Sequence, residues 1–310
     1  MPNPALAYIA LAVDDADASA SFFEQAFGLH RAEASFEREN VPLISIGETA
    51  LAFFNHGSAA LGDSSRKGVH HIAIASDAPQ LDADASGLAG PATGHATAGL
   101  DGRTQARLLC DATCGVDVRF TQPLELPRSA SPLVERLDHL GIASSDNARA
   151  RHVFVDTLQC PYESEQVDSE WETRGHNIVS EQALPGFAAY PMQLRGSLRV
   201  TFITAGDCEL EFLQDISVSV SADAARHDAA GNTRGDRSAI ARYIERYGAG
   251  LHHLAFKTDD IDAALATLAD NGYRLIDRNG RPGSRRSLIG FVHPTTTQGV
   301  LMHLVQREEL

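Results

Sequence analysis

Positive charge is scarce in this sequence of 310 residues, which has 26 Lys and Arg residues against 41 Asp and Glu residues and a formal net charge of −15. Nucleic acids and anionic membrane surfaces are bound by clustered Lys and Arg side chains. We therefore expect neither as a partner. A small internal pocket is not constrained by this balance, because its local charge differs from the total.

Disulfide motifs, long apolar runs and a basic leader are also missing. The cysteines form no Cys-x-x-Cys pair, so we expect free thiols at Cys110, Cys114, Cys160 and Cys208. No apolar run reaches the roughly 18 residues of a membrane span. The first run, MPNPALAYIALAV, contains no basic residue and is followed at once by DD, so we interpret it as a strand and not as a signal peptide. These absences predict a soluble, cytoplasmic protein.

One pattern is repeated along the chain: an apolar strand, then an acidic or polar break, then an amphipathic helix. The copies begin with YIALAVDD, HIAIASD, HLGIASSD and HLAFKTDD, at Tyr8, His71, His139 and His253. The strands are runs of small and β-branched residues. We expect the Asp after each strand to cap the following helix, because its side chain accepts a hydrogen bond from a free backbone N–H there.

Each of these helices is followed by further apolar strands, so each copy reads as a βαβββ unit. The Pro- and Ser-rich stretch around residues 126–132 marks a joint, after which the pattern restarts. We therefore predict an α+β fold in which the units pair into two domains, residues 1–125 and residues 133–310. A polar, Gly-containing stretch from Ser217 predicts a loop between the last two units.

This pattern resembles the vicinal oxygen chelate superfamily, which includes glyoxalase I, bleomycin resistance proteins, extradiol dioxygenases and methylmalonyl-CoA epimerase. The resemblance covers all four units. It is most specific in the second half, where stretches similar to methylmalonyl-CoA epimerase are LDHLGIA, ELEFLQ, SAIARYIERYGAGLHHLAFKTDDIDAAL, FVHP and GVLMHLVQ. The resemblance implies that two units form one curved sheet around a divalent metal ion, with ligands on the first and last strands of each unit.

The positions of this chain that match the family's ligands are His139, Glu211, His253 and His303. The resemblance implies that they hold one divalent ion, and three imidazoles with one carboxylate suit Zn, Co, Mn, Ni or Fe. Within the doublet His252-His253, His253 directly precedes the apolar strand, as His139 does. We expect His252 to face the opposite way, because neighbours on a strand alternate faces.

Two of these ligand positions have alternatives. Glu209 lies two residues before Glu211 on the same strand face and competes with it, although Glu211 is the better match to the family motif. The family carries Glu where this chain has His303. An imidazole keeps a donor nitrogen but removes a negative charge, which puts the family's acid-base role at this position in doubt. Either His303 is a ligand, or it is not one and the family's chemistry has been lost.

Further residues are candidates for contact with the substrate. Arg285 and Arg286 replace small residues of the epimerase family, and their guanidinium groups suit a carboxylate or phosphate, unless they belong to a solvated loop. Glu181 lies in another stretch similar to the epimerase, and Tyr190 lies in the aromatic insertion that follows it. Both are catalytic candidates. The insertion is either a lid over the site or a segment that packs against the other half.

The first half differs at the four matching positions, which hold Tyr8, Ala52, His71 and Arg119. Ala52 has no ligand atom and Arg119 repels a cation, so we predict that residues 1–125 form a degenerate domain without metal. This half then serves as a scaffold, a lid or a dimer surface. The sequence leaves open whether the protein forms a homodimer. Extradiol dioxygenases of the superfamily have the same layout of an empty first half and a metal-bearing second half.

The main functional hypothesis is a metal-dependent isomerase, epimerase or lyase that stabilises an enolate of a small, oxygen-rich substrate. His303 in place of Glu argues against methylmalonyl-CoA as that substrate. One alternative is a non-haem iron ring-cleaving (extradiol-type) dioxygenase, although a fourth protein ligand leaves fewer open positions for substrate and O₂. The other alternative is a non-catalytic small-molecule-binding protein, which four convergent polar residues disfavour.

Overall fold

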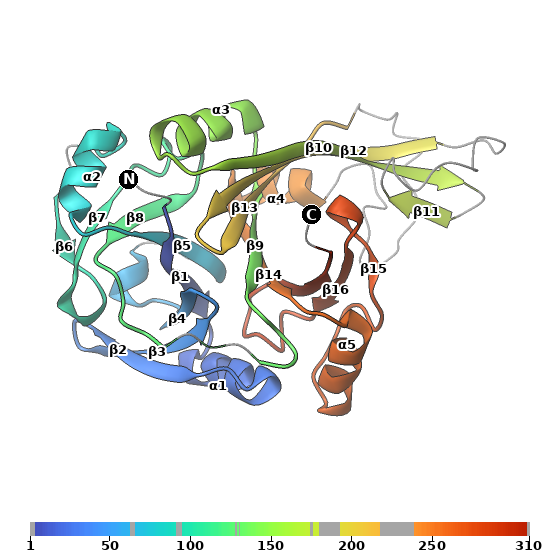
Figure 1. Cartoon of the computed structure of the whole chain (residues 1–310), viewed down its shortest axis with the longest axis horizontal. Coiled ribbons are helices and arrows are strands. Elements are labelled where there is room, and N and C mark those ends of the chain that lie inside the picture. The colour runs from blue at the N-terminus through green and yellow to red at the C-terminus, as the bar shows by residue number, and fades with distance from the viewer. Residues whose placement is uncertain are drawn as a thin grey trace.

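Two curled β-sheets lie side by side in this protein (Figure 1). The structure is a computed structural model, and it describes residues 4–62, 66–90, 95–127, 129, 131–173, 176–179, 193–217 and 239–308. Each half of the chain builds one sheet. The fold is α+β, with two βαβββ units in each half, as the repeated pattern predicts. The exact domain limits, residues 1–125 and 133–310, stay a prediction.

The first half contains two units joined by a short helical turn. The first unit comprises β1 (Leu6–Val13), α1 (Ala16–Phe27), β2 (Arg31–Phe36), β3 (Glu39–Ile46) and β4 (Thr49–Asn55). The turn is η1 (Ala59–Leu61). The second unit comprises β5 (Gly68–Ala75), α2 (Pro79–Ser86), β6 (Thr97–Ala98), η2 (Leu100–Gly102), β7 (Thr104–Arg107) and β8 (Asp117–Thr121).

The second half repeats this order with longer strands and an added helix between its units. Its first unit comprises β9 (Leu137–Ala143), α3 (Asn147–Arg151), η3 (His152–Thr157), β10 (Tyr162–Thr173), β11 (His176–Val179), β12 (Gln193–Ala205) and β13 (Cys208–Asp215). The added helix is α4 (Ala239–Tyr247). The last unit comprises β14 (Gly250–Lys257), α5 (Ile261–Asp270), β15 (Arg281–Pro282), η6 (Ser284–Arg286), β16 (Leu288–Val292) and β17 (Met302–Gln306).

The two sheets have equivalent strand orders. The first is β2-β3-β4-β1-β5-β8-β7-β6, and the second is β11-β10-β12-β13-β9-β14-β17-β16-β15. In each sheet the first strands of the two units pair antiparallel at the centre, and the last strand of each unit lies beside its own first strand in parallel. The strands β13, β9, β14 and β17 are therefore neighbours, although they are far apart in the sequence.

Acidic caps begin three of the four unit helices, as the sequence predicts. Asp15, Asp146 and Asp260 each accept a hydrogen bond from the backbone N–H three residues on. The prediction is wrong for α2, whose N-cap is Ala78 and carries no side-chain cap. Pro79 at the next position fixes the start of α2 there, because proline suits the first helical turn.

A continuous apolar core joins the two halves. Its buried residues come from both sheets and from helices α1 and α5. At the junction, the rings of Phe23 and Phe27 from α1 lie 5.6 and 6.3 Å from the ring of Phe256 in β14. The ring of Phe22 meets Tyr273 edge-on at 4.9 Å. This shared packing fixes the first half against the back of the strand that carries His253.

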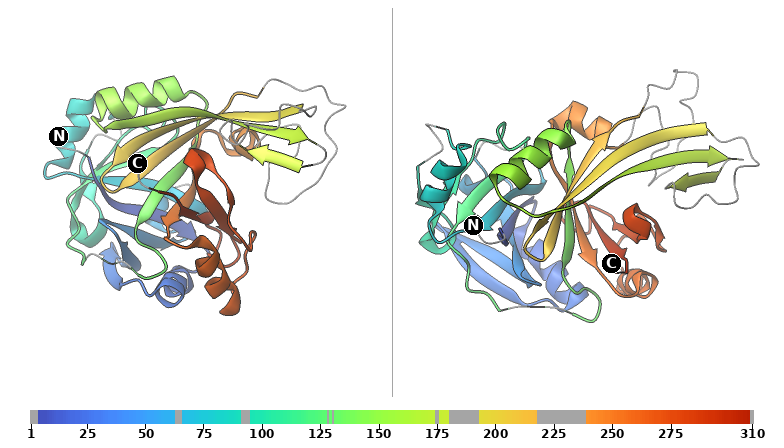
Figure 2. Two further views of the ribbon diagram at one scale, coloured as in Figure 1. Left: turned by 45° about the vertical axis from the view of Figure 1, so that its right-hand side comes forward. Right: turned by 45° about the horizontal axis from the view of Figure 1, so that its top comes forward.

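The strands β10 and β12 extend beyond the body of the second sheet as a long arm that ends beside β11 (Figures 1 and 2).

The four cysteines are free thiols, as predicted. Within the described ranges, no helix has the length and apolar character needed to cross a bilayer.

Candidate metal centre

The four predicted ligand side chains meet on one face of the second sheet. His139 lies on β9, Glu211 on β13, His253 on β14 and His303 on β17, which are neighbouring strands. The strand register places Gly141 opposite both Glu211 and His253. All four side chains are buried, with residue exposures of 6 % for His139, 5 % for Glu211, 5 % for His253 and 3 % for His303.

The donor nitrogens of the three histidines lie close enough to one another to share an ion, and Glu211 lies beside two of them. A Glu211 oxygen, Oε2, lies 3.4 Å from Nε2 of His139 and 3.7 Å from Nε2 of His253. One ring nitrogen from each of His139, His253 and His303 lies within 4.8 Å of those of the other two. The ring centroid of His303 is 5.2 Å from that of His139 and 4.9 Å from that of His253. Their role as metal ligands stays a prediction.

Among the described residues, the inward ring nitrogens have no hydrogen-bond partner. Nε2 of His139, Nε2 of His253 and both nitrogens of His303 are buried and unpaired. Leaving buried polar atoms unpaired costs free energy, so native structures rarely do it without a ligand or water to pair them. Imidazole nitrogens and a carboxylate are donors for divalent transition metals. The residues present therefore fit the ion that the family resemblance implies.

The outward nitrogens of two predicted ligands, His139 and His253, are held in place. Nδ1 of His139 lies 2.9 Å from Oδ2 of Asp138, which is fully buried and also accepts hydrogen bonds from Arg307. Nδ1 of His253 lies 2.9 Å from Nδ1 of His252. Such contacts fix the ring orientation and leave Nε2 facing the cluster. The sequence analysis missed Asp138, although a carboxylate directly before the predicted ligand His139 is a readable signal.

His252 does not face away from His253 as expected, because both side chains line the same cavity. The pairing of β14 with β9 shifts register between Leu251 and His253, which makes His252 the extra residue of a β-bulge. A bulge interrupts the alternation of faces, so the simple strand rule fails at this position. Burial, together with the charge of Arg66, lowers the pKa of His252 to about 4.

Gly141 makes room for the His253 ring. A β-carbon at this position would lie 2.0 Å from Cε1 and 2.5 Å from Nε2 of His253, far inside van der Waals contact. The glycine is therefore required by the close approach of the ring to the β9 backbone. Its signal in the sequence is a glycine two residues after the predicted ligand His139, on the same strand face, which the sequence analysis did not use.

Burial governs the protonation of the cluster. It lowers the pKa of His253 and His303 well below the usual value and raises the pKa of the Glu211 carboxyl. Burial also acts to lower the pKa of His139, but the neighbouring carboxylates of Glu211 and Asp138 outweigh it and raise that pKa. A divalent ion favours neutral imidazoles and an ionised carboxylate together, because these ligands bind in their deprotonated forms.

The cluster opens onto a cavity of about 430 Å³. Most of its wall is apolar, and the side chains involved include Leu198, Phe202, Leu213, Ile240, Ile289 and Phe291. A volume of this size suits a small molecule. Among the acidic residues of the lining, Asp168 on β10 joins Asp138 and Glu211, and it accepts hydrogen bonds from Gln166 and Ser284. The sequence analysis did not single out Asp168.

Arg285 lines this cavity but is already engaged. Its guanidinium pairs with Glu209, lies 3.0 Å from an oxygen of Glu163, and stacks 3.6 Å from the centre of the Phe202 ring. Glu209 also pairs with Arg307 at 3.4 Å and does not line the cavity, whereas Glu211 does. Arg285 therefore shapes the wall through ion pairs, and its role as a substrate contact stays a prediction.

The remaining predicted residues are placed differently. Arg286 is exposed and does not line the cavity, so the structure does not bring it to the cluster. Its substrate role stays a prediction. Glu181 and Tyr190, the two catalytic candidates, lie outside the described residues.

The equivalent place in the first sheet is filled by its own side chains. Tyr8, Ala52, His71 and Arg119 are all buried there. Nε2 of His71 lies 3.5 Å from the Tyr8 hydroxyl, and Arg119 pairs with Asp117 at 3.4 Å and donates to the Ala60 carbonyl at 3.1 Å. His70, His71 and Asp117 lie near one another, but the two imidazoles contact each other through Nδ1 at 2.9 Å. That this half holds no metal stays a prediction.

Paired βαβββ units that form a curled sheet define the glyoxalase-like class of α+β proteins. The Glyoxalase/Bleomycin resistance protein/Dioxygenase superfamily matches the chain over residues 5–89 and again over residues 138–291. The two matches cover most of the chain, one in each half. The protein therefore belongs to this superfamily.

The following sequence relatives each align with a little over half of the chain. It is 27 % identical over 173 residues to the uncharacterized protein YqjC of Bacillus subtilis, covering 56 % of this chain and 93 % of that protein. It is 22 % identical over 192 residues to the mitochondrial methylmalonyl-CoA epimerase of Bos taurus, covering 61 % of this chain and 85 % of the relative.

One solved structure matches both halves together. A mutant of 4-hydroxymandelate synthase from Streptomyces coelicolor aligns with 99 % of this chain and 94 % of its own, at a TM-score of 0.62 and 15 % sequence identity. This likeness shows that the two-half fold is shared by another protein of known structure.

Proposed function

We propose that the protein is a metal-dependent isomerase of the epimerase type, or a lyase, that acts on a small oxygen-rich substrate through an enolate. The observation that carries the proposal is the buried cluster of His139, Glu211, His253 and His303, whose unpaired nitrogens face a cavity of about 430 Å³. The proposed cofactor is one divalent ion, Zn, Co, Mn, Ni or Fe. Relatives named methylmalonyl-CoA epimerase and ethylmalonyl-CoA/methylmalonyl-CoA epimerase support the class of reaction.

The residues of the chain divide the chemistry among them. A bound divalent ion supplies Lewis-acid stabilisation of the oxyanion of an enolate. Asp138 orients the ring of His139, and His252 orients that of His253. The apolar wall formed by Phe202 and Phe291 excludes water from the reacting carbon. Proton transfer at that carbon needs a base within reach of the substrate, and Asp168 is the candidate in the described part of the cavity.

A second candidate is a ring-cleaving dioxygenase, and the aromatic walls of the cavity favour it. The Phe291 ring lies 4.7 Å from that of His303 and 6.2 Å from that of His253, and the Phe202 ring lies 6.5 Å from that of His139. Aromatic rings on two sides of a site suit a planar aromatic substrate. Four protein ligands still leave few open positions for such a substrate together with O₂.

Metal analysis followed by two activity assays separates these candidates. An isomerase predicts incorporation of deuterium from ²H₂O at the carbon next to a carbonyl, measured with a panel of 2-oxo acids and acyl thioesters. A dioxygenase predicts bound iron and O₂ uptake with catechols. A protein that binds no metal but holds a small molecule tightly contradicts both and supports a non-catalytic binding protein.

Substitution of His303 sharpens the proposal. We expect His303→Ala to weaken metal binding about tenfold or more, because it removes one donor nitrogen. His303→Glu supplies a carboxylate oxygen in its place and is expected to retain the ion. If the Glu variant also gains activity on an acyl-CoA, the position at residue 303 separates this protein from the epimerases. Equal metal affinity in the wild type and the Ala variant contradicts the role of His303 as a ligand.

A further inference from the structure

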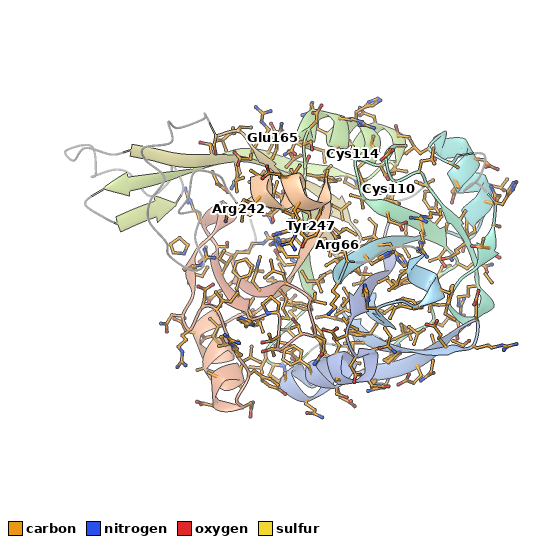
Figure 3. All side chains as sticks on the ribbon, turned by 180° about the vertical axis from the view of Figure 1, so that it is seen from behind. Arg66, Cys110, Cys114, Glu165, Arg242 and Tyr247 are labelled. Carbon is orange, nitrogen blue, oxygen red and sulfur yellow. The ribbon has the colours of Figure 1, made fainter. Side chains whose placement is uncertain are left out.

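An arginine from the first half reaches the β-bulge that precedes the predicted ligand His253. Arg66 lies just before β5, and its Nη2 donates to the carbonyl of Leu251 at 3.0 Å. Leu251 is the residue directly before His252 in the bulge of β14. Figure 3 shows Arg66 beside Tyr247, between α4 and the ribbon of the first half.

The same nitrogen of Arg66 also binds the equivalent carbonyl of the first half. It donates to the Val69 carbonyl at 3.0 Å, and Val69 directly precedes the doublet His70-His71. The pairing of β5 with β1 shifts register at this doublet, as the pairing of β14 with β9 does at His252. One guanidinium therefore joins the two equivalent bulges across the contact between the halves.

A tyrosine from α4 completes the contact on the side of the metal centre. The Tyr243 hydroxyl donates to the same Leu251 carbonyl at 2.5 Å, and its ring meets His252 edge-on at 4.7 Å. The Arg66 guanidinium lies 5.2 Å from the centre of the Tyr243 ring. Arg66 thus contacts both the carbonyl before His252 and the ring that packs against it.

The orientation of His252 decides which nitrogen of His253 is free. The two imidazoles meet through their Nδ1 atoms at 2.9 Å, so one Nδ1 donates and the other accepts. When Nε2 of His253 offers its lone pair to a cation, Nδ1 of His253 carries the proton and donates it to His252. The His252 ring must then keep its Nδ1 lone pair aimed at His253, which a loose bulge would not ensure.

We propose that Arg66 is a positioning residue for the ligand His253. It holds the bulge through the Leu251 carbonyl and the Tyr243 ring, and so fixes the His252 ring that accepts the Nδ1 proton of His253. The inference rests on the proposed metal centre. It gives the first half a part in that centre, although this half contributes none of the four predicted ligands.

The test compares Arg66→Met with Arg149→Met. Arg149 is a matched control, because it also donates from one half to a backbone carbonyl of the other, that of Asp111 at 2.6 Å, and it does not line the metal cavity. We expect Arg66→Met to weaken Zn²⁺ binding about tenfold, measured by competition with a chromophoric chelator, and to shift the visible spectrum of the Co²⁺-loaded protein. Arg149→Met is expected to change neither.

Several outcomes decide the inference. Equal Zn²⁺ affinity and equal Co²⁺ spectra for the two variants overturn it while leaving the metal centre intact. A wild-type protein that binds neither ion overturns the proposed function itself. If Arg66→Met does not fold, Tyr243→Phe carries the test, since it removes only the hydroxyl bonded to the Leu251 carbonyl. We expect that variant to lose several-fold in Zn²⁺ affinity, and unchanged affinity contradicts the proposal.

Discussion

The two halves of this protein place different side chains at the same four positions of the same sheet. In the second half, three imidazoles and a carboxylate converge, and among the described residues their inward nitrogens have no hydrogen-bond partner. In the first half, Tyr8 and His71 contact each other, and Arg119 is paired with Asp117 and with the Ala60 carbonyl. One sheet therefore presents donor atoms that a cation can pair, whereas at the equivalent positions of the other sheet His71 and Arg119 contact groups of the same half.

The charges at the four matching positions of the first half differ from those of the second half. Arg119 supplies a positive charge inside the sheet, and Asp117 balances it. Burial, with the charge of Arg119, lowers the pKa of His71 well below its usual value, and burial raises the pKa of Tyr8 to about 12. Both rings are therefore neutral near pH 7, and the charged groups beside them are Arg119 and Asp117.

A single atom at one strand position adds to this difference. The residue opposite the second histidine is Gly141 in the second half and Ala10 in the first. A β-carbon at Gly141 would collide with the His253 ring at 2.0 Å. The methyl group of Ala10 thus excludes from the first half the ring position that His253 occupies in the second.

The largest expected effect comes from removing this difference. Gly141→Ala pushes the His253 ring away from Glu211, and we expect Zn²⁺ affinity to fall at least a thousandfold, about 4 kcal/mol. The measurement is chelator competition, with circular dichroism to establish that the variant is folded. Ala10→Gly, the matched change in the first half, is expected to leave the affinity as it is. A folded Gly141→Ala protein with wild-type affinity would contradict the assigned geometry.

The next effect concerns the internal cation of the first half. Arg119→Met leaves a buried carboxylate with one partner fewer, and we expect a loss of about 3 kcal/mol in the free energy of unfolding in urea. Metal content is expected to stay unchanged. The control is Arg31→Met, which removes partly exposed pairs with Asp17 and Glu33 and is expected to cost less than about 1 kcal/mol. Equal losses in the free energy of unfolding for the two variants would show that the buried ion pair of Arg119 stabilises the fold no more than an exposed one.

A smaller effect is expected from the pH dependence of stability. Burial lowers the pKa of His70 from 6.5 to about 4, so the unfolded chain takes up the proton first as the pH falls. The stability that comes from a neutral His70 is complete above pH 6.5 and is lost between pH 6.5 and 4. At pH 5 the loss in the free energy of unfolding is about 2 kcal/mol. We expect His70→Gln, studied without metal in urea, to lose less stability than the wild type between pH 7 and pH 5. Parallel losses would contradict the shifted pKa.

The smallest expected effect concerns the support of a ligand. Asp138 holds Nδ1 of His139, whereas the first half has Ala7 at the equivalent position. We expect Asp138→Asn to weaken Zn²⁺ binding about tenfold, because an amide accepts the imidazole proton less strongly than a carboxylate. Glu135→Gln, which changes a carboxylate paired with Lys257, serves as the control. Equal Zn²⁺ affinities for the two variants would contradict a role of Asp138 in supporting His139.

Much of the architecture was readable in the sequence because each unit repeats the same apolar strand, acidic break and helix. That repeat placed His139 and His253 at the starts of equivalent strands, and the structure brings them together. The face of His252 was predicted wrongly, because a β-bulge depends on how two strands pair and leaves no mark in one strand alone. The start of α2 was missed for a local reason, the proline at position 79.

Other features of the site depend on contacts between distant residues. Arg285, whose role as a substrate contact stays a prediction, forms an ion pair with Glu209, 76 positions away in the sequence. Arg66 reaches Leu251 over 185 positions. Neither pairing follows from periodicity or motif spacing, because both are set by the curl of the second sheet and by the packing of the halves.

The most direct test of the account is the metal content of matched variants, measured by plasma mass spectrometry after purification with divalent ions present. We predict one divalent ion per chain in the wild type and in His71→Ala, and none in His253→Ala. These two histidines occupy equivalent positions in β5 and β14. A wild-type protein without metal, or a His253→Ala variant that keeps its ion, would contradict the claim that the second sheet alone forms the metal centre.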